Sequence, residues 1–259
     1  MEGSSISLLK GALSQAGIIL NAAQLEALNA FGDFLVNKNA QFNLTSIRDE
    51  TGIVVRHFLD SLSPAIYVRE LAALYSAGNP ESKDLVDVGS GAGFPGIPLK
   101  ILFGDALNVT LIDSTLKKVN FMTEAAGLLR LNGCRAVHTR ADEAAGRAGM
   151  RGRFNYATAR AVAALPKLIE YCLPLLAPGG ILIAMKGRRA AAEGELAQSG
   201  PQLAKYGGRL VDIIGFSLDS RAGFGPPPDI GSANGSSAAV RSNPDATKYE
   251  RTLMIIRNG

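Results

Sequence analysis

The segment Leu85–Pro98, LVDVGSGAGFPGIP, constrains the fold most, because it joins the pattern of a buried strand to a cluster of glycines. The run LVDV is apolar enough to fill a parallel strand, and Gly89 and Gly91 allow a tight turn beneath a ligand. Asp87 interrupts the run where a dinucleotide site usually has an apolar residue. A carboxylate there suits a cofactor with a cationic amino-acid tail, which favours an adenosyl cofactor. Its other reading is a hydrogen bond to the backbone of the turn.

The glycines alone leave the cofactor open, because Gly91, Gly93 and Gly96 also match the G-x-G-x-x-G spacing of NAD-binding proteins. A second apolar run ends at Asp113, about 20 residues beyond the turn, where NAD and S-adenosylmethionine (SAM) sites both need an acid at the ribose. The alternative for Asp113 is to cap the helix predicted to start near Leu116. Both cofactors therefore remain possible at this point.

The order of the later elements favours SAM. We predict a fourth strand over 154–161, a helix over 165–177, a stop at 178–180 and a strand over 181–185. The chain has one glycine fingerprint and no second mononucleotide half that would hold a nicotinamide. One cofactor half beside a target pocket is the plan of a methyltransferase.

Six ordered segments then resemble a known family, the small-subunit ribosomal RNA methyltransferase G family, also called glucose-inhibited division protein B. The segments, which lie within roughly residues 20 to 190, are FNLTSIRD (42–49), VRHFLDSL (55–62), DVGSGAGFPGIPL (87–99), LIDSTLKKVNF (111–121), TARAVAAL (158–165) and AMKG (184–187). The resemblance implies a SAM-dependent enzyme that methylates N7 of a guanine in 16S ribosomal RNA, free or in the small ribosomal subunit. We therefore expect an α/β fold of the Rossmann-like class I methyltransferase type, with a mostly parallel seven-stranded sheet and an N-terminal helical lobe.

The resemblance also implies which residues contact SAM. They are Gly89, Phe94, Asp113, Ala141, Asp142 and Arg160. Asp142 follows the third apolar stretch, where its side chain or a neighbouring amide would meet the adenine; capping a short helix over 143–147 is its alternative. Guanine N7 carries a free lone pair, so we expect no general base and assign Arg160 and Lys186 to RNA phosphates or the cofactor carboxylate.

Basic residues gather in two stretches that we place near the carboxyl ends of strands, where they would meet RNA phosphates or simply be solvated. The first comprises Arg140, Arg147, Arg151, Arg153 and Arg160, and the second Lys186, Arg188 and Arg189. The whole chain has 27 Lys and Arg against 23 Asp and Glu, so its net charge of +4 supports RNA binding only weakly.

Residues 1–80 read as a helical lobe and 81–259 as the methyltransferase core, with a linker at 78–82. Within the lobe, His57, Asp60 and Ser61 lie within one helical turn, a spacing that does not make a hydrolase triad. His57 and Asp60 either link the lobe to the rim of the site or form an ordinary polar face. Asn43 is either a turn former or an RNA contact.

The segment 216–247 is rich in Gly, Pro, Ser and Ala, and we expect a mobile insertion near 217–247. The runs 209–217 and 251–257 flank it and should pair as closing antiparallel strands. Cys134 and Cys172 lack metal-ligand or disulfide spacing, so we expect reduced, partly buried thiols and no metal site. We further expect a cytoplasmic monomer without a membrane segment. An NAD(P)-dependent oxidoreductase and a non-catalytic RNA-binding regulator are the alternative functions.

Overall fold

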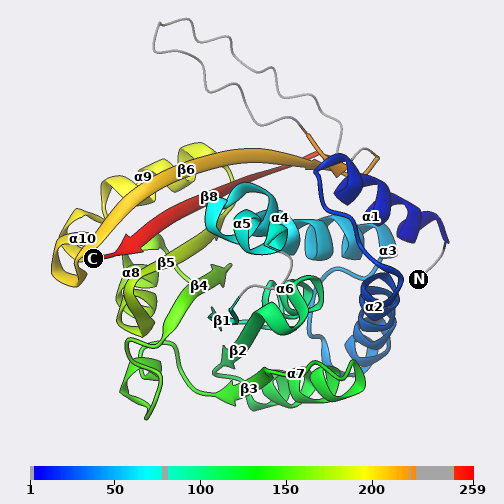
Figure 1. The fold of residues 1–259 in the computed structure, drawn as a ribbon, viewed down its shortest axis with the longest axis horizontal. Helices are drawn as coiled ribbons and strands as arrows, with labels where there is room; N and C mark the ends of the chain where they lie inside the picture. The colour runs from blue at the N-terminus through cyan, green and yellow to red at the C-terminus, as the bar shows by residue number, and fades with distance from the viewer. Residues whose placement is uncertain (1–2, 78–80, 222, 226–247) are drawn as a thin grey trace, which may run out of the picture.

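The computed structural model describes residues 3–77, 81–221, 223–225 and 248–259. Its centre is one sheet in the order β3-β2-β1-β4-β5-β8-β6-β7 (Figure 1). The strands are β1 (Lys83–Val88), β2 (Leu107–Asp113), β3 (Cys134–His138), β4 (Phe154–Arg160), β5 (Leu176–Lys186), β6 (Gly208–Asp219), β7 (Gly223–Phe224) and β8 (Lys248–Asn258). Strands β1 to β5 are parallel and the other three antiparallel, so the predicted α/β fold is confirmed. The described sheet has one strand more than the predicted seven; the two-residue β7 is its shortest member.

Helices cover both faces of this sheet (Figure 1). On one side lie α1 (Gly3–Gln15), α2 (Ala22–Phe42), α3 (Glu50–Gly52), the π-helical segment η1 (Ile53–Leu59), α4 (Asp60–Tyr67), α5 (Arg69–Ser76), α6 (Gly96–Phe103) and α7 (Leu116–Leu128). On the other lie α8 (Leu165–Cys172), α9 (Arg189–Ala197) and α10 (Gly200–Tyr206). In the described part of the chain, no helix combines the length and the hydropathy of a membrane span.

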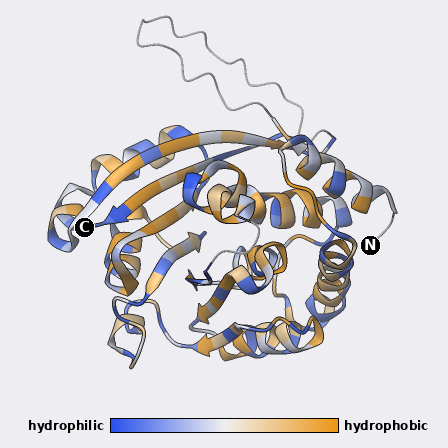
Figure 2. Ribbon diagram, viewed as in Figure 1, coloured by the Kyte–Doolittle hydropathy of each residue, from blue (hydrophilic) through white to orange (hydrophobic). Residues whose placement is uncertain are grey.

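Alternate residues of the central strands feed two separate cores, as the pleat of a strand requires. In β1, Leu85 joins the core shared with α1, α2, α4 and α6, whereas Val86 and Val88 join the core shared with α8. Hydrophobic residues accordingly run along the central strands and the helices beside them (Figure 2). Strands buried on both faces read in sequence as mainly apolar runs, which is why β1, β2 and β4 were predictable although each contains polar residues.

The N-terminal helices form no separate core in the described residues. Phe31 of α2 and Phe58 of η1 are fully buried, and they belong to the same hydrophobic cluster as Phe94, which follows β1, and Leu111 of β2. The predicted domain boundary falls between residues 80 and 81, and residues 78–80 of the predicted linker lie outside the described residues. Helix α2 ends at Phe42 and is capped by Asn43. Asn43 has a left-handed φ of 49°, and its amide donates to the Asn39 carbonyl. The turn-forming role, one of the two that the sequence left open for Asn43, is therefore observed.

Strand β5 begins earlier than predicted. The helix expected over 165–177 ends at Cys172, a single 3-10 turn covers 173–175, and β5 starts at Leu176. The sequence Pro-Gly-Gly that was predicted as a stop therefore lies inside the strand, at a register shift opposite Phe154 and Tyr156. A Cβ on Gly180 would lie 2.9 Å from the carbonyl oxygens of Ala177 and Phe154, so the strand tolerates this irregularity because the residue is glycine.

The closing strands pair as predicted, with Arg209 opposite Arg257 and Phe216 opposite Arg251. The expected insertion is shorter in the structure, because residues up to Asp219 extend β6 and 223–224 form β7. The remainder of that prediction, 226–247, lies outside the described residues.

Candidate active site

The site lies where the strand order reverses, between β1 and β4. The turn after β1 and the loop after β4 meet at the edge formed by the carboxyl ends of the parallel strands, the carboxyl edge, where open α/β sheets bind ligands. Gly89 touches this loop: it has a φ of 67°, and a Cβ there would lie 2.6 Å from Val162 Cγ2. Glycine is therefore required for the close approach of turn and loop.

Gly91 is the position at which the turn opens outward. Its φ is 61°, and a Cβ built on it would meet no described atom within 4 Å. Added carbons at Gly93 and Gly96 would instead collide with Ile97 and Leu111. The turn thus packs tightly on its inner side and presents backbone to open space at Gly91.

Asp87 supports this turn from below. Its carboxylate is completely buried; Oδ2 accepts from the Gly96 amide at 3.1 Å and Oδ1 accepts from the Thr158 hydroxyl at 2.8 Å. Burial raises the pKa of this carboxyl from 3.8 to about 6, against the lowering effect of these hydrogen bonds. The contacts are those of the turn-holding role that the sequence left open beside the cofactor role.

Asp113 joins the end of β2 to the same turn. Its Oδ2 accepts from the Gly91 amide at 3.0 Å, and its Oδ1 accepts from the Thr115 amide at 2.8 Å. Thr115, and not Asp113, is the N-cap of α7. The carboxylate of Asp113 therefore orients the one part of the turn that faces open space, and Lys118 Nζ lies 3.8 Å away.

Ala141 and Asp142 follow β3 on the carboxyl edge. Ala141 is half-buried and Asp142 is exposed, with its carboxylate 3.0 Å from Arg140 Nη2. The short helical stretch predicted after them is a 3-10 turn, Ala144–Gly146, which has no side-chain cap. The capping alternative for Asp142 is therefore not observed.

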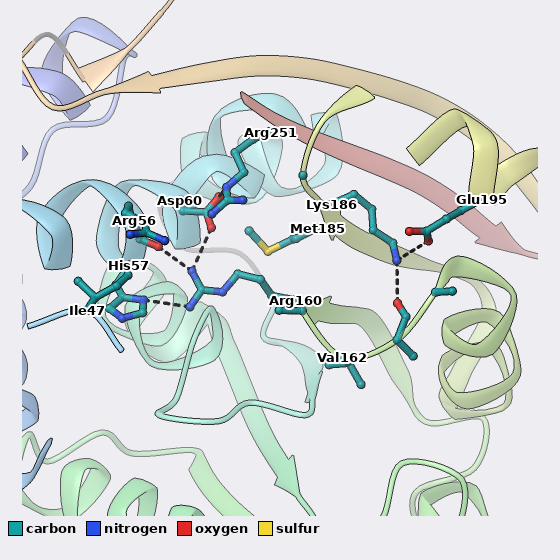
Figure 3. A pocket seen from close by; sticks show the side chains of 14 residues that line it. Ile47, Arg56, His57, Asp60, Arg160, Val162, Met185, Lys186, Glu195 and Arg251 are labelled. Atoms are coloured by element: carbon teal, nitrogen blue, oxygen red, sulfur yellow. Dashed lines mark hydrogen bonds and ion pairs between the residues drawn. The ribbon is translucent and has the colours of Figure 1, made fainter. Parts of the chain in front are cut away.

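Arg160, the last residue of β4, binds the π-helical segment η1 and the start of α4. Its Nη1 donates to the Arg56 carbonyl at 2.9 Å and to Asp60 Oδ2 at 3.0 Å, and its Nη2 donates to His57 Nδ1 at 3.2 Å (Figure 3). The Asp60 side chain is 1% exposed, and its Oδ1 also lies 3.0 Å from Arg251 Nε. His57 and Asp60 thus link the helical segment to the rim of the site, one of the two roles the sequence left open.

His57 is held as a neutral ring. Because Nδ1 accepts from Arg160, Nε2 carries the proton and donates to Thr45 Oγ1 at 2.9 Å, and the ring stacks on Phe94 at 4.3 Å. Burial and then the nearby arginines, Arg160 foremost, lower its pKa from 6.5 to about 3. Ser61 is buried among its neighbours, and its hydroxyl has no hydrogen-bond partner in the described chain, so the two residues form no nucleophile–base pair.

Lys186, the last residue of β5, is occupied by protein contacts. Its Nζ donates to the Ala163 carbonyl at 2.7 Å and lies 2.6 Å from Glu195 Oε2. The same carboxylate oxygen accepts from the Leu165 amide. Lys186 therefore ties α9 to the loop after β4 and carries a compensated charge.

A cavity of about 530 Å³ lies beside the glycine turn (Figure 3). It is lined by Ile47, Arg56, His57, Asp60, Arg160, Ala161, Val162, Ala163, Ala164, Met185, Lys186, Gly187, Glu195 and Arg251. Of the predicted site residues, Arg160 and Lys186 line it, as do His57 and Asp60, whereas the remaining predicted cofactor residues do not: Asp87, Gly89, Gly91, Phe94, Asp113, Ala141 and Asp142.

Three of the charged lining residues, Arg56, Glu195 and Arg251, were not singled out from the sequence. Arg56 lies in the segment VRHFLDSL, which is one of those that resemble the family, and this resemblance was a reason to consider it. Glu195 and Arg251 lie on α9 and β8, outside any motif.

The first basic stretch has members at both edges of the sheet, because Arg160 ends β4 and Arg153 precedes it. The predicted placement near the carboxyl ends of strands is therefore wrong for Arg153. Arg153 precedes β4 at the opposite edge and pairs with Asp84 near the start of β1, because a residue just before a parallel strand lies at the amino edge. Arg147 donates to the carbonyl of His138, at the end of β3. The second stretch, after β5, does lie at the carboxyl edge.

The sheet and glycine turn together define a class I SAM-dependent methyltransferase. Within that class, the chain belongs to the family described as rRNA small subunit methyltransferase G, whose model matches residues 24–213. It is 43% identical over 207 residues to Ribosomal RNA small subunit methyltransferase G of Leuconostoc citreum, covering 80% of this chain and 82% of that protein. The protein of the same name from Levilactobacillus brevis is 43% identical over 210 residues, covering 81% and 83%.

Among solved structures, the branched-chain polyamine synthase of Thermus thermophilus shares the fold alone. The TM-score is 0.51 at 15% sequence identity, covering 77% of this chain and 55% of that chain.

Proposed function

We propose that this protein transfers the methyl group of SAM to N7 of a guanine in 16S ribosomal RNA. The observation that carries the proposal is the turn in which Asp113 holds the Gly91 amide, intact in a chain that belongs to the rRNA small subunit methyltransferase G family. A fold of this type hosts many activities, so we infer the substrate from the family and the cofactor from the turn.

The residues of the turn fit SAM. Gly91 leaves space for a ligand against the backbone. Each Asp113 carboxylate oxygen accepts one backbone amide and has a second lone pair, which a hydroxyl of the ribose diol would use. We place Gly89, Gly91 and Phe94 along the cofactor, Ala141 and Asp142 near the adenine, and Arg160 near its carboxylate. Asp87 acts through the turn, because its carboxylate is completely buried beneath the turn and holds the Gly96 amide and the Thr158 hydroxyl.

SAM supplies a methyl group on a positively charged sulfur, and guanine N7 has a lone pair ready to accept it. The site needs no base to remove a proton, and His57 offers none, because one ring nitrogen accepts from Arg160 and the other donates to Thr45. What the chain contributes is alignment of the two reactants, which can account for about 7 to 11 kcal/mol of a barrier.

We place the reaction in the cytoplasm, where the ribosomal substrate is found, and propose that a monomer suffices.

The test is transfer of radiolabelled methyl from SAM to 16S RNA, presented as naked RNA and as the assembled small subunit. The proposal predicts label in one or both substrates with the wild-type chain, and strongly reduced labelling with Asp113→Ala. Asp105→Ala, which removes an exposed carboxylate before the amino end of β2, is the matched control and should label normally.

The two alternatives give different results. Tight NAD(H) binding without SAM binding or labelling would make the protein an oxidoreductase. RNA binding without SAM binding would make it a non-catalytic regulator.

A further inference from the structure

The cavity beside the glycine turn has more positive than negative charge. Four cations line it, from Arg56, Arg160, Lys186 and Arg251, but only two carboxylates, from Asp60 and Glu195. The remaining titratable lining residue, His57, is neutral because its pKa is lowered to about 3. The lining therefore carries an excess of two positive charges.

The excess is concentrated on Arg56 and Arg251. Glu195 lies 2.6 Å from Lys186, and the one Asp60 carboxylate is shared between Arg160 and Arg251. Arg56 has no ion pair among the described residues; its guanidinium lies 5.0 Å above the Tyr249 ring.

Two donors on these arginines are also unused. The Nε atoms of Arg56 and Arg251 are buried and have no hydrogen-bond partner within the described chain. Asp60 Oδ1 lies 3.0 Å from Arg251 Nε, but the pair lacks hydrogen-bond alignment. Buried charged donors without acceptors are costly, and an anionic ligand in the cavity would offset the charge that these guanidinium groups carry.

SAM does not supply the missing charge. Its sulfonium and ammonium groups outnumber its single carboxylate, so the bound cofactor would add to the positive excess. The Arg160 guanidinium lies 5.3 Å from the ring of Phe94 in the turn, whereas Arg251 approaches Asp60 through the other carboxylate oxygen. The cofactor carboxylate therefore has a partner without Arg56 or Arg251.

We propose that Arg56 and Arg251 form a subsite for an RNA phosphodiester next to the target guanosine. Guanidinium groups bind phosphate oxygens through paired hydrogen bonds, and a phosphate contact positions a substrate without reading its sequence. Arg251 is on β8, beyond the residues 24–213 matched by the family model, so the subsite joins the closing strand to the active site. This inference rests on the proposed function, because it assumes that RNA enters this cavity.

The experiment measures binding of a 16S RNA transcript to Arg56→Gln and Arg251→Gln across a range of salt concentrations, and SAM binding by calorimetry. Each variant should bind the RNA about tenfold more weakly, the size of one charged hydrogen bond. Each should also reduce the magnitude of the salt slope, by up to about 0.7, the contribution of one phosphate on a single strand. SAM affinity should stay unchanged. Arg56→Lys should keep the salt slope, because it keeps the charge.

Arg209→Gln is the matched control, since Arg209 is exposed on β6 at the amino edge of the sheet. Circular dichroism checks the folding of every variant, and Arg56→Gln keeps the test valid if Arg251→Gln fails to fold. Weaker SAM binding with unchanged RNA binding would overturn the subsite in favour of the cofactor carboxylate. RNA binding equal to the control, or a wild-type chain that does not bind RNA, would also overturn it. RNA binding without methyl transfer would contradict the proposed function alone.

Discussion

Asp60→Ala should strongly destabilise the protein, because Asp60 neutralises two arginines in the interior of the site. The carboxylate is 1% exposed and lies 3.0 Å from both Arg160 and Arg251, whose side chains are 16% and 27% exposed. Removing one partner of a buried ion pair costs about 3 to 5 kcal/mol. Because both arginines retain some contact with water, we expect the lower end, about 3 kcal/mol.

Thermal unfolding followed by circular dichroism measures this loss. At roughly 2 °C per kcal/mol for a chain of this length, Asp60→Ala should lower Tm by about 6 °C. Glu124→Ala is the control, since it breaks the half-exposed Lys38–Glu124 pair and should cost less than about 1 kcal/mol. If Asp60→Ala melts within 1 °C of the wild type, Asp60 does not hold the arginines as the structure indicates.

Three further changes test the interior of the site. Asp87→Asn removes a carboxyl whose pKa is raised to about 6. The Asn oxygen still accepts from the Gly96 amide, and its NH2 group donates to the Thr158 hydroxyl in place of accepting from it. The free energy of unfolding of the variant should therefore rise relative to that of the wild type between pH 4 and 7, on the order of 3 kcal/mol by urea unfolding; a difference that is constant with pH would contradict the burial argument. His57→Gln removes a ring whose pKa is lowered to about 3. Because the unfolded chain takes up a proton on this ring before the folded chain does, only the wild type should lose about 2 kcal/mol of its free energy of unfolding between pH 6.5 and 5 in the same assay. An equal loss in both proteins would refute the neutral ring. Gly96→Ala forces a Cβ into Leu111, so it should lower the free energy of unfolding by about 1 to 3 kcal/mol and weaken SAM binding measured by calorimetry. The control Gly127→Ala has open space around it in α7 and should be neutral or slightly stabilising. Equal effects of the two substitutions would argue against the packed turn.

The sheet was predictable because its central strands are buried on both faces and read as apolar runs. Asp87 and Asp113 were predicted as site residues because each is a charged residue in an otherwise apolar run. Asp87 lies inside β1, and Asp113 is the last residue of β2. The structure explains both positions, because each carboxylate accepts a backbone amide of the glycine turn. Local sequence was sufficient here because strand, turn and acid are close together in the chain.

The arginine cluster was not predictable in the same way. Asp60 and Arg160 are 100 positions apart, and Arg251 follows a segment without periodic pattern. The sequence drew attention to His57, Asp60 and Arg160 but neither to their pairing nor to Arg251, because contacts between segments far apart in the chain leave no local spacing. Strand β5 was misplaced at its start for a related reason: the Gly-Gly pair reads locally as a stop, and only the pairing with β4 shows it to be an irregular strand.

The central claim is that the methyl group is placed on guanine N7, and the most direct measurement is the position of the methyl on the modified base. A 16S RNA treated with this protein and SAM would be reduced with borohydride and treated with aniline, which cleaves the chain at 7-methylguanosine. The account predicts one new cleavage site, at a guanine, that is lost when SAM is omitted. Methyl incorporation without cleavage would mean that another atom is methylated and would contradict the account.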